Sequence, residues 1–551
     1  MAATRVPELP EVLPVKAQCL PYAQIPHTSR LFLDFLSDFP KVQQFYPSSP
    51  YSSEWQKPPR RHYDPERRTR VSEILERQNR AWGASEKTVA NISRLRAGAS
   101  AALTGQQVGL FGGPLFALYK ALSAVKLAEQ ATTAGVDCVP VFWLATNDHD
   151  LAEVNHTTFP APGGSLQLIT TPSHGVDDAP VGTIHFGDEI AGVVQAAGEL
   201  LGDTPVTEML RESYRAGESF GSAFARLFAR LFADWGVILL DPCDPEMQAI
   251  AAPIYKAAIE RAAEIDDALL ERGKALERAG YHQQVKVTPS STLLFTLHEG
   301  ARIPIHRRLN GHSMEFLAGE RKLSQQELLA QIASTPHQFS PNVLLRPIVE
   351  DYLLPTLCYT GGTAEVAYFA QVAVVYERLL GQVTPILPRF SSTLVEPKLQ
   401  GLLERYDLTL ADVFAGEEAL REKIAARILP PELQSAFERA GASLETSLAE
   451  IRKALVRLDK TLAEAADNAG SKMQHQLESL RGRAARAELR QSEIAGRHAQ
   501  QLSASLYPNK TLQERETAGV AYLARHGTDL LRELYASLHT DCHDHQVITV
   551  D

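Results

Sequence analysis

The 551-residue sequence predicts an α/β protein with a mostly parallel sheet, followed by a C-terminal α-helical coiled coil. Three observations support this fold class. Apolar runs of strand length alternate with segments of helical periodicity, which is typical of parallel strands joined by helices. Glycine-rich turns and polar clusters follow several of these runs, as expected at the carboxyl ends of parallel strands. Beyond Pro431 the composition changes, and apolar residues adopt a heptad spacing.

Composition limits the classes of protein to which the chain can belong. Its length suits about two to four domains of ordinary size. Hydrophobic residues make up 44% and charged residues 22%, which is typical of a folded globular protein. The net charge of -11 argues against broad affinity for nucleic acid or anionic membranes. No apolar stretch reaches the roughly 20 residues that span a bilayer, and the N-terminus lacks the apolar core of a secretory signal.

The cysteines predict neither a disulfide framework nor a thiolate zinc site, because they lie far apart and form no CxxC motif. They are Cys19, Cys138, Cys243, Cys358 and Cys542. A reducing cytoplasm is therefore the expected location. A C-terminal group resembles a metal-binding tract, but a mobile polar tail is the preferred interpretation. That group is His539, Cys542, His543 and His545.

A first strand, turn and helix unit begins at Ser100. Ser100 to Leu103 is predicted to end a buried strand, and the loop Thr104-Gly105-Gln106-Gln107-Val108-Gly109 follows it. Pro114 can then start an apolar helix. The backbone amides of the loop and the helix start are candidates for binding a phosphate or carboxylate. A purely structural tight turn explains the loop equally well.

A second unit contains the densest polar cluster. Val139 to Ala145 has the length and composition of a strand buried on both faces, and Asp148-His149-Asp150 follows, at the start of a possible helix. His149 could be a general base or acid, with a carboxylate fixing its tautomer. His156, two helical turns further, could face the same cleft. In the alternative interpretation Asp148 is a helix cap and the histidines make structural contacts. Metal ligation would match no established zinc spacing.

Two segments are predicted to be insertions into a core of residues 1–395. The first, about 157–230, is rich in Pro, Gly, Asp and His at its start, and the second, about 282–340, contains antiparallel strand candidates. A second polar cluster follows them. Arg346 and Arg389 suit bidentate binding of carboxylate or phosphate, and Glu365 could hold a substrate ammonium. Structural ion pairs are the alternative for all three.

The C-terminal region, residues 396–551, is predicted to be a helical coiled-coil domain. Its clearest apolar seam alternates spacings of four and three, through Leu444, Leu448, Ile451, Leu455, Leu458 and Leu462. Asp459-Lys460-Thr461 could cap a second helix. An antiparallel hairpin is therefore favoured over one continuous rod.

Two common nucleotide-binding motifs are missing. The sequence contains no GxxxxGK[ST], which disfavours a P-loop kinase or ATPase, and no GxGxxG dinucleotide fingerprint. Any nucleotide would have to bind in another way.

Five segments are more specific than these general patterns. They are TGQQVGLFGGPLFALYKALSAVKLA, PVFWLATNDHDLAEVNH, LRPIVEDYLLPTLCYTGGTAEVAYFAQ, PRFSSTLVEP and LYPNKTLQERE. Together they resemble the bacillithiol biosynthesis cysteine-adding enzyme family. The resemblance extends from about residue 30 to beyond Arg515. Two positions depart from the family pattern, with Asn147 where glutamate is expected and Thr363 where proline is usual. The first removes a charge from the expected pocket, and the second alters turn stiffness.

The resemblance implies a Rossmann-like core with two connecting insertions and a C-terminal coiled coil that forms a homodimer. It also implies a cysteine ligase that joins L-cysteine to glucosaminyl malate and so makes bacillithiol. Amide formation from a free carboxylate is unfavourable, so activation by ATP, through an adenylate or acyl phosphate, is expected. The implied pocket contains Thr104, Gly105, Gln106, Gln107, Asp148, His149, Asp150, Arg346, Glu365, Tyr368 and Arg389.

Within this pocket the catalytic residues would be Asp148, His149 and Asp150. His149 would take a proton from the attacking amine. The loop from Thr104 would hold the anionic part of a substrate, and Arg346 or Arg389 would bind malate or phosphate. No metal ligands are assigned. Two other functions stay open: a metal-dependent hydrolase or deacetylase using Asp148 to His156, and a noncatalytic scaffold whose working part is the coiled coil.

Overall fold

A computed structural model describes residues 17–58, 63–161, 165–172, 174–310, 313–539 and 541–550. The described residues form two compact units. The core unit combines the described residues of Met1–Pro160, Gln167–Thr393 and Glu514–Ile548, and the helical unit is mainly Leu394–Gln513. The sequence placed all of 396–551 in one C-terminal domain, whereas Glu514–Ile548 packs with the core unit.

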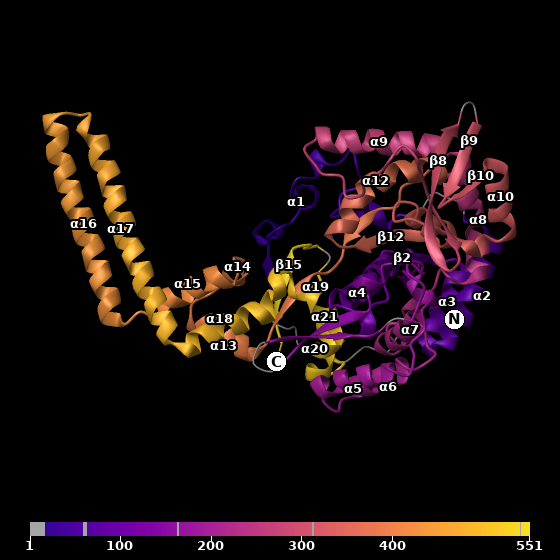
Figure 1. The fold of residues 1–551 in the computed structure, drawn as a ribbon, viewed down its shortest axis with the longest axis horizontal. Coiled ribbons are helices and arrows are strands. Elements are labelled where there is room, and N and C mark those ends of the chain that lie inside the picture. The colour runs from indigo at the N-terminus through magenta and orange to yellow at the C-terminus, as the bar shows by residue number, and fades with distance from the viewer. Residues whose placement is uncertain are drawn as a thin grey trace. The chain divides into compact units, whose positions relative to one another are not determined.

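A five-stranded parallel sheet forms the centre of the core unit (Figure 1). Its strand order is β13-β12-β2-β3-β6. In chain order the first strand is central, the next two extend the sheet on one side, and the last two extend it on the other. The order therefore reverses between β2 and β12, which is the topological switch point of a Rossmann-like sheet. The bounds are β2 (Ser100–Gln106), β3 (Cys138–Leu144), β6 (Ile238–Leu240), β12 (Thr356–Gly361) and β13 (Ile386–Pro388).

The central strands are apolar because helices cover them. Every residue of β3 is buried, as its uninterrupted apolar run predicted. Phe142 of β3 packs against Phe224 and Phe228, with ring centroids 6.0 and 5.2 Å away. The helices of the core unit near this sheet include α4 (Phe116–Thr133), α7 (Phe220–Leu231), α8 (Pro245–Glu260), α9 (Ala262–Arg278), α11 (Arg346–Leu353) and α12 (Thr363–Leu379).

The N-terminal part of the core unit supplies three more helices, α1 (Arg30–Ser37), α2 (Pro65–Ala81) and α3 (Glu86–Ala97). A break separates α2 from α3. Gly83 adopts a φ of +81°, and the side chain of Ser85 caps α3 by accepting a hydrogen bond from Thr88 N at 3.3 Å. A left-handed glycine ends one helix, and a serine cap starts the next.

Both predicted insertions are present. The first contains the strand pair β4 (His156–Pro160) and β5 (Leu166–Thr170), followed by α5 (Ile190–Leu201) and α6 (Pro205–Ser213). The second is an antiparallel sheet of order β10-β9-β8-β7-β11. Its elements are β7 (Ser291–His298), β8 (Ala301–Asn310), β9 (Ser313–Ala318), β10 (Arg321–Ser324), α10 (Gln325–Ser334) and β11 (Phe339–Pro341).

The C-terminal segment is part of a third sheet, of order β1-β15-β14, so the expectation of a mobile polar tail was wrong. Its strands are β1 (Ala17–Leu20), β14 (Ser392–Val395) and β15 (His545–Thr549), which follow α20 (Gly519–His526) and α21 (Leu530–Ser537). His545 is fully buried, with Nδ1 2.7 Å from Ser391 Oγ and Nε2 2.8 Å from Thr393 Oγ1. Burial lowers the pKa of His545 to about 4, so this imidazole is neutral.

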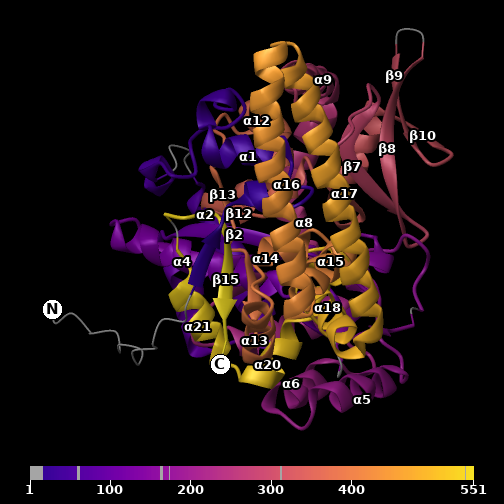
Figure 2. The same ribbon diagram turned by 90° about the vertical axis from the view of Figure 1, so that its left-hand side faces the viewer.

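The helical unit contains the predicted antiparallel hairpin. The helices α16 (Pro431–Leu458) and α17 (Leu462–Gln491) lie side by side in both ribbon views (Figures 1 and 2). Asp459 Oδ1 accepts a hydrogen bond from Thr461 N at 2.8 Å, which confirms the turn. The other helices are α13 (Pro397–Arg405), α14 (Leu410–Phe414), α15 (Glu417–Arg427) and α18 (Glu493–Leu506). Among the described helices of both units, none is long and apolar enough to cross a membrane.

Candidate active site

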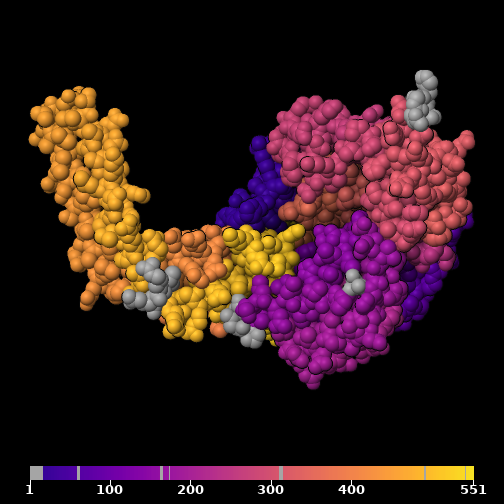
Figure 3. Space-filling view, viewed as in Figure 1, coloured from indigo at the N-terminus to yellow at the C-terminus, as the bar shows by residue number. Residues whose placement is uncertain are grey.

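A cavity of about 760 Å³ opens at the carboxyl ends of the parallel strands, where the strand order reverses. The space-filling view shows the core unit hollowed between the purple first insertion and the pink second insertion (Figure 3). Residues of the second insertion line the cavity, among them Gln284, Phe295 and Arg302. It also brings together most of the predicted pocket, namely Gly105, Gln106, Gln107, Asp148, His149, Arg346, Glu365, Tyr368 and Arg389.

Two predicted pocket residues do not line this cavity. Thr104 is fully buried, and its Oγ1 donates a hydrogen bond to the carbonyl oxygen of Thr360 at 2.8 Å, which ties β2 to β12. Asp150 is exposed, and its Oδ1 accepts a hydrogen bond from Glu153 N at 3.3 Å. These two side chains therefore make structural contacts, and the substrate-binding and catalytic roles expected of them stay predictions.

At the predicted anion site near the start of α4, backbone N–H groups already donate to acceptors of the protein. The helix starts at Phe116, two residues after Pro114. Leu115 N donates to the carbonyl oxygen of Thr517 at 2.9 Å, and Gly112 N donates to the Tyr214 hydroxyl at 3.0 Å. These donors have protein acceptors, so we do not assign a phosphate to them.

Lys120 of α4 lies beneath the switch point, and sequence reasoning did not identify it. Its Nζ is 2.8 Å from Glu365 Oε2 and donates hydrogen bonds to Gly105 O at 2.6 Å and Gln106 Oε1 at 2.9 Å. Glu365 also accepts from the Tyr359 hydroxyl at 2.8 Å and from Gly362 N at 2.7 Å. Glu365 therefore holds Lys120 and caps α12, whereas we had expected it to bind a substrate ammonium.

Burial acts on the two partners of this pair in opposite ways. It lowers the pKa of Lys120 to about 8, although the neighbouring Glu365 carboxylate favours the charged amine. Burial alone would raise the pKa of Glu365, but Lys120 and the hydrogen bonds from Gly362 and Tyr359 hold that pKa below its usual value. Glu365 is therefore ionised at neutral pH, while Lys120 can exchange a proton near neutral pH.

His149 is held by Arg302 of the second insertion. Arg302 Nη1 lies 2.9 Å from His149 Nδ1, while its other nitrogens donate to Ser340 Oγ and to the carbonyl oxygen of Pro341. Arginine has donors only, so Nδ1 of His149 must accept, and the proton of the neutral ring lies on Nε2. In this arrangement Nδ1 of His149 is occupied by Arg302, and Nε2 is the ring's donor. The role of proton acceptor for the attacking amine stays a prediction.

Asp148 and Gln107 connect the loops that follow β3 and β2. Gln107 Nε2 donates to Asp148 Oδ2 at 3.1 Å and to Glu153 Oε2 at 2.6 Å. Asp148 Oδ1 accepts from His149 N at 2.9 Å. The predicted helix after β3 is absent, and a short 3-10 turn at Leu151–Glu153 takes its place. His149 and His156 nevertheless line the same cavity.

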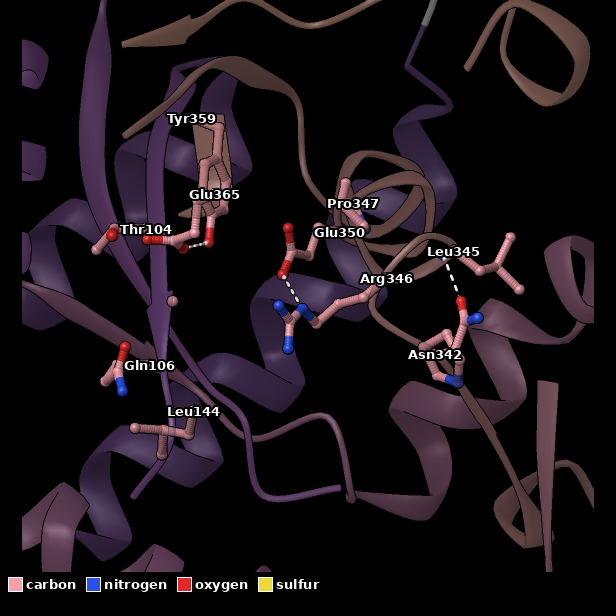
Figure 4. Close-up of polar contacts among 12 residues, drawn as sticks. Thr104, Gln106, Leu144, Asn342, Leu345, Arg346, Pro347, Glu350, Tyr359 and Glu365 are labelled. Atoms are coloured by element: carbon pink, nitrogen blue, oxygen red, sulfur yellow. Dashed lines mark hydrogen bonds and ion pairs between the residues drawn. The ribbon is translucent and has the colours of Figure 1, made fainter. Parts of the chain in front are cut away.

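Arg346, the first residue of α11, lies beside an unusual carboxyl group. Its Nε is 3.6 Å from Glu350 Oε1 (Figure 4). Its Nη2 donates to the Tyr368 hydroxyl at 3.4 Å. Neither carboxyl oxygen of Glu350 has a hydrogen-bond partner. Burial raises the pKa of Glu350 to about 8, so its charge is largely suppressed at neutral pH. The positive charge of Arg346 is then available to an anion in the cavity.

Two further arginines flank the ring of Phe116, with guanidinium carbons 5.2 Å (Arg389) and 5.6 Å (Arg515) from its centroid. Arg389 is committed to the protein, because Nη2 is 2.6 Å from Glu514 Oε1 and Nη1 donates to the carbonyl oxygen of Phe390. Among the described residues, Arg515 forms no ion pair through its guanidinium, and it lines the cavity. Arg515 is thus a better candidate than Arg389 for binding a carboxylate.

The cavity residues that the sequence analysis did not identify had only weak sequence patterns to mark them. Lys120 is a lone charge inside the apolar stripe of α4, and a buried lysine on such a stripe requires a partner. Arg302 comes from a strand of the second insertion, and Arg515 lies more than a hundred residues after the rest of the cavity. Across the described ranges, no three His, Cys, Asp or Glu side chains converge in a way that could hold a metal ion.

Comparison with known proteins covers almost the whole chain. Residues 15–390 match the family model of the "Bacillithiol biosynthesis BshC, N-terminal Rossmann-like domain", and residues 392–550 match that of the corresponding C-terminal coiled-coil domain. A protein of Koribacter versatilis is 50% identical over 97% of this chain and 99% of its own length. Proteins of Solibacter usitatus and Salinibacter ruber are 36% and 34% identical over 97% and 94% of this chain, and 99% and 96% of their own lengths. All three are named "Putative cysteine ligase BshC".

The buried Arg389 and Glu514 pair predicts a pH-dependent stability. We expect Glu514→Gln to lower the free energy of unfolding at pH 7 by about 3–5 kcal/mol, because it leaves a buried arginine without its counter-charge. Arg389 holds the pKa of Glu514 below its usual 4.5, so this contribution is present above that pH and is lost as the pH falls below it. The difference between parent and variant should therefore shrink in acid.

Urea unfolding followed by tryptophan fluorescence measures this effect, since all four tryptophans belong to the core unit. Glu208→Gln is the matched control, because Glu208 is an exposed residue of α6 that pairs with Arg211, and it should change stability by at most about 0.5 kcal/mol. A Glu514→Gln protein as stable as this control at pH 7 would contradict the prediction.

Proposed function

This chain belongs to the BshC family of bacillithiol biosynthesis proteins, and on that basis we propose that it joins L-cysteine to glucosaminyl malate. The reaction would make the amide bond of bacillithiol from the carboxyl group of cysteine and the amino group of the sugar. A single observation supports this proposal beyond family membership. The cavity at the switch point combines cations suited to an anionic substrate with an amine that titrates near neutral pH.

We assign the binding of the malate carboxylates to Arg346 and Arg515. Arg346 has only a largely neutral carboxyl beside it, and Arg515 makes no ion pair in the described structure. Arginine binds carboxylates through parallel N–H donors, which gives both charge and orientation. His149, with its proton on Nε2, would donate a hydrogen bond to an oxygen of the reacting carboxyl group.

Lys120 is the proton acceptor in this proposal. The attacking nitrogen must lose a proton as the amide bond forms, and a general base works best with a pKa close to the working pH. The pKa of Lys120, about 8, meets this condition. As an ammonium its Nζ contacts Gly105, Gln106 and Glu365, so Lys120 must first lose a proton before it can accept the proton of the amine. Lys120 replaces His149 in the role that the sequence suggested.

ATP would supply the leaving group that a free carboxylate lacks. Hydroxide is a poor leaving group, so an unactivated cysteine carboxylate would not react at a useful rate. The sequence has no P-loop, and we assign no residue to the nucleotide. We further propose a cytoplasmic location, where free cysteine and ATP are both available.

Mass spectrometry of the reaction tests the proposed function. Purified protein with cysteine, glucosaminyl malate and ATP should yield bacillithiol, and omission of any one of the three should abolish it. Product that forms without ATP would contradict only the activation step. If no combination gives bacillithiol while an established ligase of this type is active in the same buffer, the proposed reaction is wrong.

The two assigned roles predict different kinetic changes. Lys120→Arg keeps a positive charge but cannot release a proton, so we expect kcat to fall at least about 100-fold with little change in KM. Arg515→Ala should instead raise KM for glucosaminyl malate about tenfold or more, with KM for cysteine unchanged. In the parent, kcat should fall as the pH decreases below about 8, because Lys120 becomes protonated.

Matched variants separate these effects from general damage. Lys126→Arg lies on the same helix, beside Tyr535, and Arg532→Ala removes an arginine that pairs with Asp234 away from the cavity. Both should keep parental kinetics, and thermal unfolding should show that all four variants are folded. A Lys120→Arg protein with parental kcat would exclude Lys120 as the proton acceptor.

We also propose that the helical unit forms a homodimer. Several apolar side chains of the hairpin lie exposed, which is unusual for a solvated helix surface. They are Leu433, Ile451, Leu458, Met473 and Leu480. Light scattering should give twice the 60.5 kDa mass of the chain, and Ile451→Glu with Leu480→Glu should return it to a monomer. A monomeric parent at micromolar concentration would contradict this assembly.

A further inference from the structure

We infer that Cys19 and Cys542 are a thiol pair that forms a reversible intramolecular disulfide by exchange with a low-molecular-weight aliphatic disulfide. The two Sγ atoms lie 3.2 Å apart although 523 positions separate them in the sequence. Both residues belong to the core unit. Widely spaced cysteines had predicted no disulfide, because sequence spacing does not show which segments the fold brings together.

The surrounding structure holds the two thiols in place. Cys19 lies on β1, which pairs antiparallel with β15 and places Cys19 opposite Gln546. Cys542 lies in the segment just before β15. The next residue, His543, anchors that segment, since its Nε2 is 3.3 Å from the carbonyl oxygen of Pro50 and its ring packs 5.0 Å from that of Tyr51. The sulfur atoms therefore need to approach by only about 1 Å to bond.

Accessibility distinguishes this pair from the other cysteines. Cys19 is exposed and Cys542 is partly exposed, so a small disulfide can reach them. Cys138 and Cys358 are buried, and burial raises the pKa of both thiols. Cys243 has no cysteine neighbour among the described contacts. The fold thus provides a single accessible thiol pair within the described residues.

The chemistry balances without a further oxidant. The Cys19 thiolate attacks one sulfur of the small disulfide, which forms a mixed disulfide and expels one small thiolate. The Cys542 thiolate then attacks the Cys19 sulfur of that mixed disulfide and expels the second small thiolate. Two protein thiols are oxidised, the small disulfide is reduced to two thiols, and the two thiol protons pass to the thiolates that leave.

Burial, the adjacent Cys542 thiol and nearby aspartates raise the pKa of Cys19 to about 11. At neutral pH Cys19 is therefore mostly in the thiol form, and it attacks small disulfides slowly. Slow exchange means that the pair responds to a sustained rise in small disulfides and not to a brief one. The reduced form is the resting form in a reducing compartment.

The position of the pair connects it to the candidate active site. Cys542 and His543 share a small cavity with Arg389 and Phe390, and Arg389 also lines the main cavity. A disulfide would fasten β1 to the segment that packs behind Arg389. The inference does not depend on the proposed ligase reaction, because the thiols can be counted without any substrate.

Thiol counting and peptide mapping test this inference on the full-length protein. Reduced protein freed of reductant and incubated with oxidised glutathione should lose two of its five thiols. A non-reducing digest should give one cross-linked pair of peptides that contain Cys19 and Cys542, and dithiothreitol should restore all five thiols. The oxidised protein should unfold a few degrees higher than the reduced protein, because the cross-link restricts the unfolded chain.

Two variants provide the controls. Cys19→Ser should give no cross-link and no rise in unfolding temperature, and should instead accumulate a glutathione adduct at Cys542. Cys243→Ser should form the cross-link as the parent does. Retention of all five thiols in the folded protein, a cross-link between other cysteines, or a stable glutathione adduct on Cys19 of the parent would each overturn the inference.

Discussion

The ion pair between Lys120 and Glu365 is the interaction on which the geometry of the switch point depends. It joins the helix after β2 to the helix after β12, and it lies under the ends of both strands. The lysine also binds the carbonyl oxygen of Gly105, where a side chain would meet Trp143 at 3.2 Å. A buried charge pair tolerates little displacement, so these strand ends are fixed relative to each other. The cavity keeps its shape for the same reason.

The partners that the protein provides for its buried arginines determine which positive charges in the cavity are free for a ligand. Each buried arginine needs a carboxylate or an aromatic face, and the chain provides a different one for each. Arg389 has Glu514, and Arg302 stacks on Phe295 at 3.8 Å while it donates to His149. Arg346 donates to the Tyr368 hydroxyl and has Glu350 as its neighbouring carboxyl group, whose charge burial suppresses. The cations that remain for a ligand are therefore those that the protein itself neutralises least, Arg346 and Arg515.

Much of the fold and part of the candidate site could be predicted from the sequence. The buried strand before Asp148 and the hairpin turn at Asp459 have local causes, since apolar runs and capping residues act on neighbouring residues. The loop predicted from Thr104 was wrong at its start, because β2 continues to Gln106. The clusters around His149 and Arg346 were identified because polar residues follow apolar strands. Partner choice could not be predicted in the same way, because an ion pair or hydrogen bond depends on which distant segments meet.

The sequence by itself determined the fold class, the parallel sheet with its two insertions, the hairpin, and the polar loops that line the cavity. Only the tertiary structure decided which side chains are free to act. It placed Arg302 on His149, Glu365 on Lys120 and Glu514 on Arg389, and it brought Cys19 to Cys542. The physical reason is that burial and long-range pairing set the protonation and availability of a group, and neither can be derived from residue type or spacing along the chain.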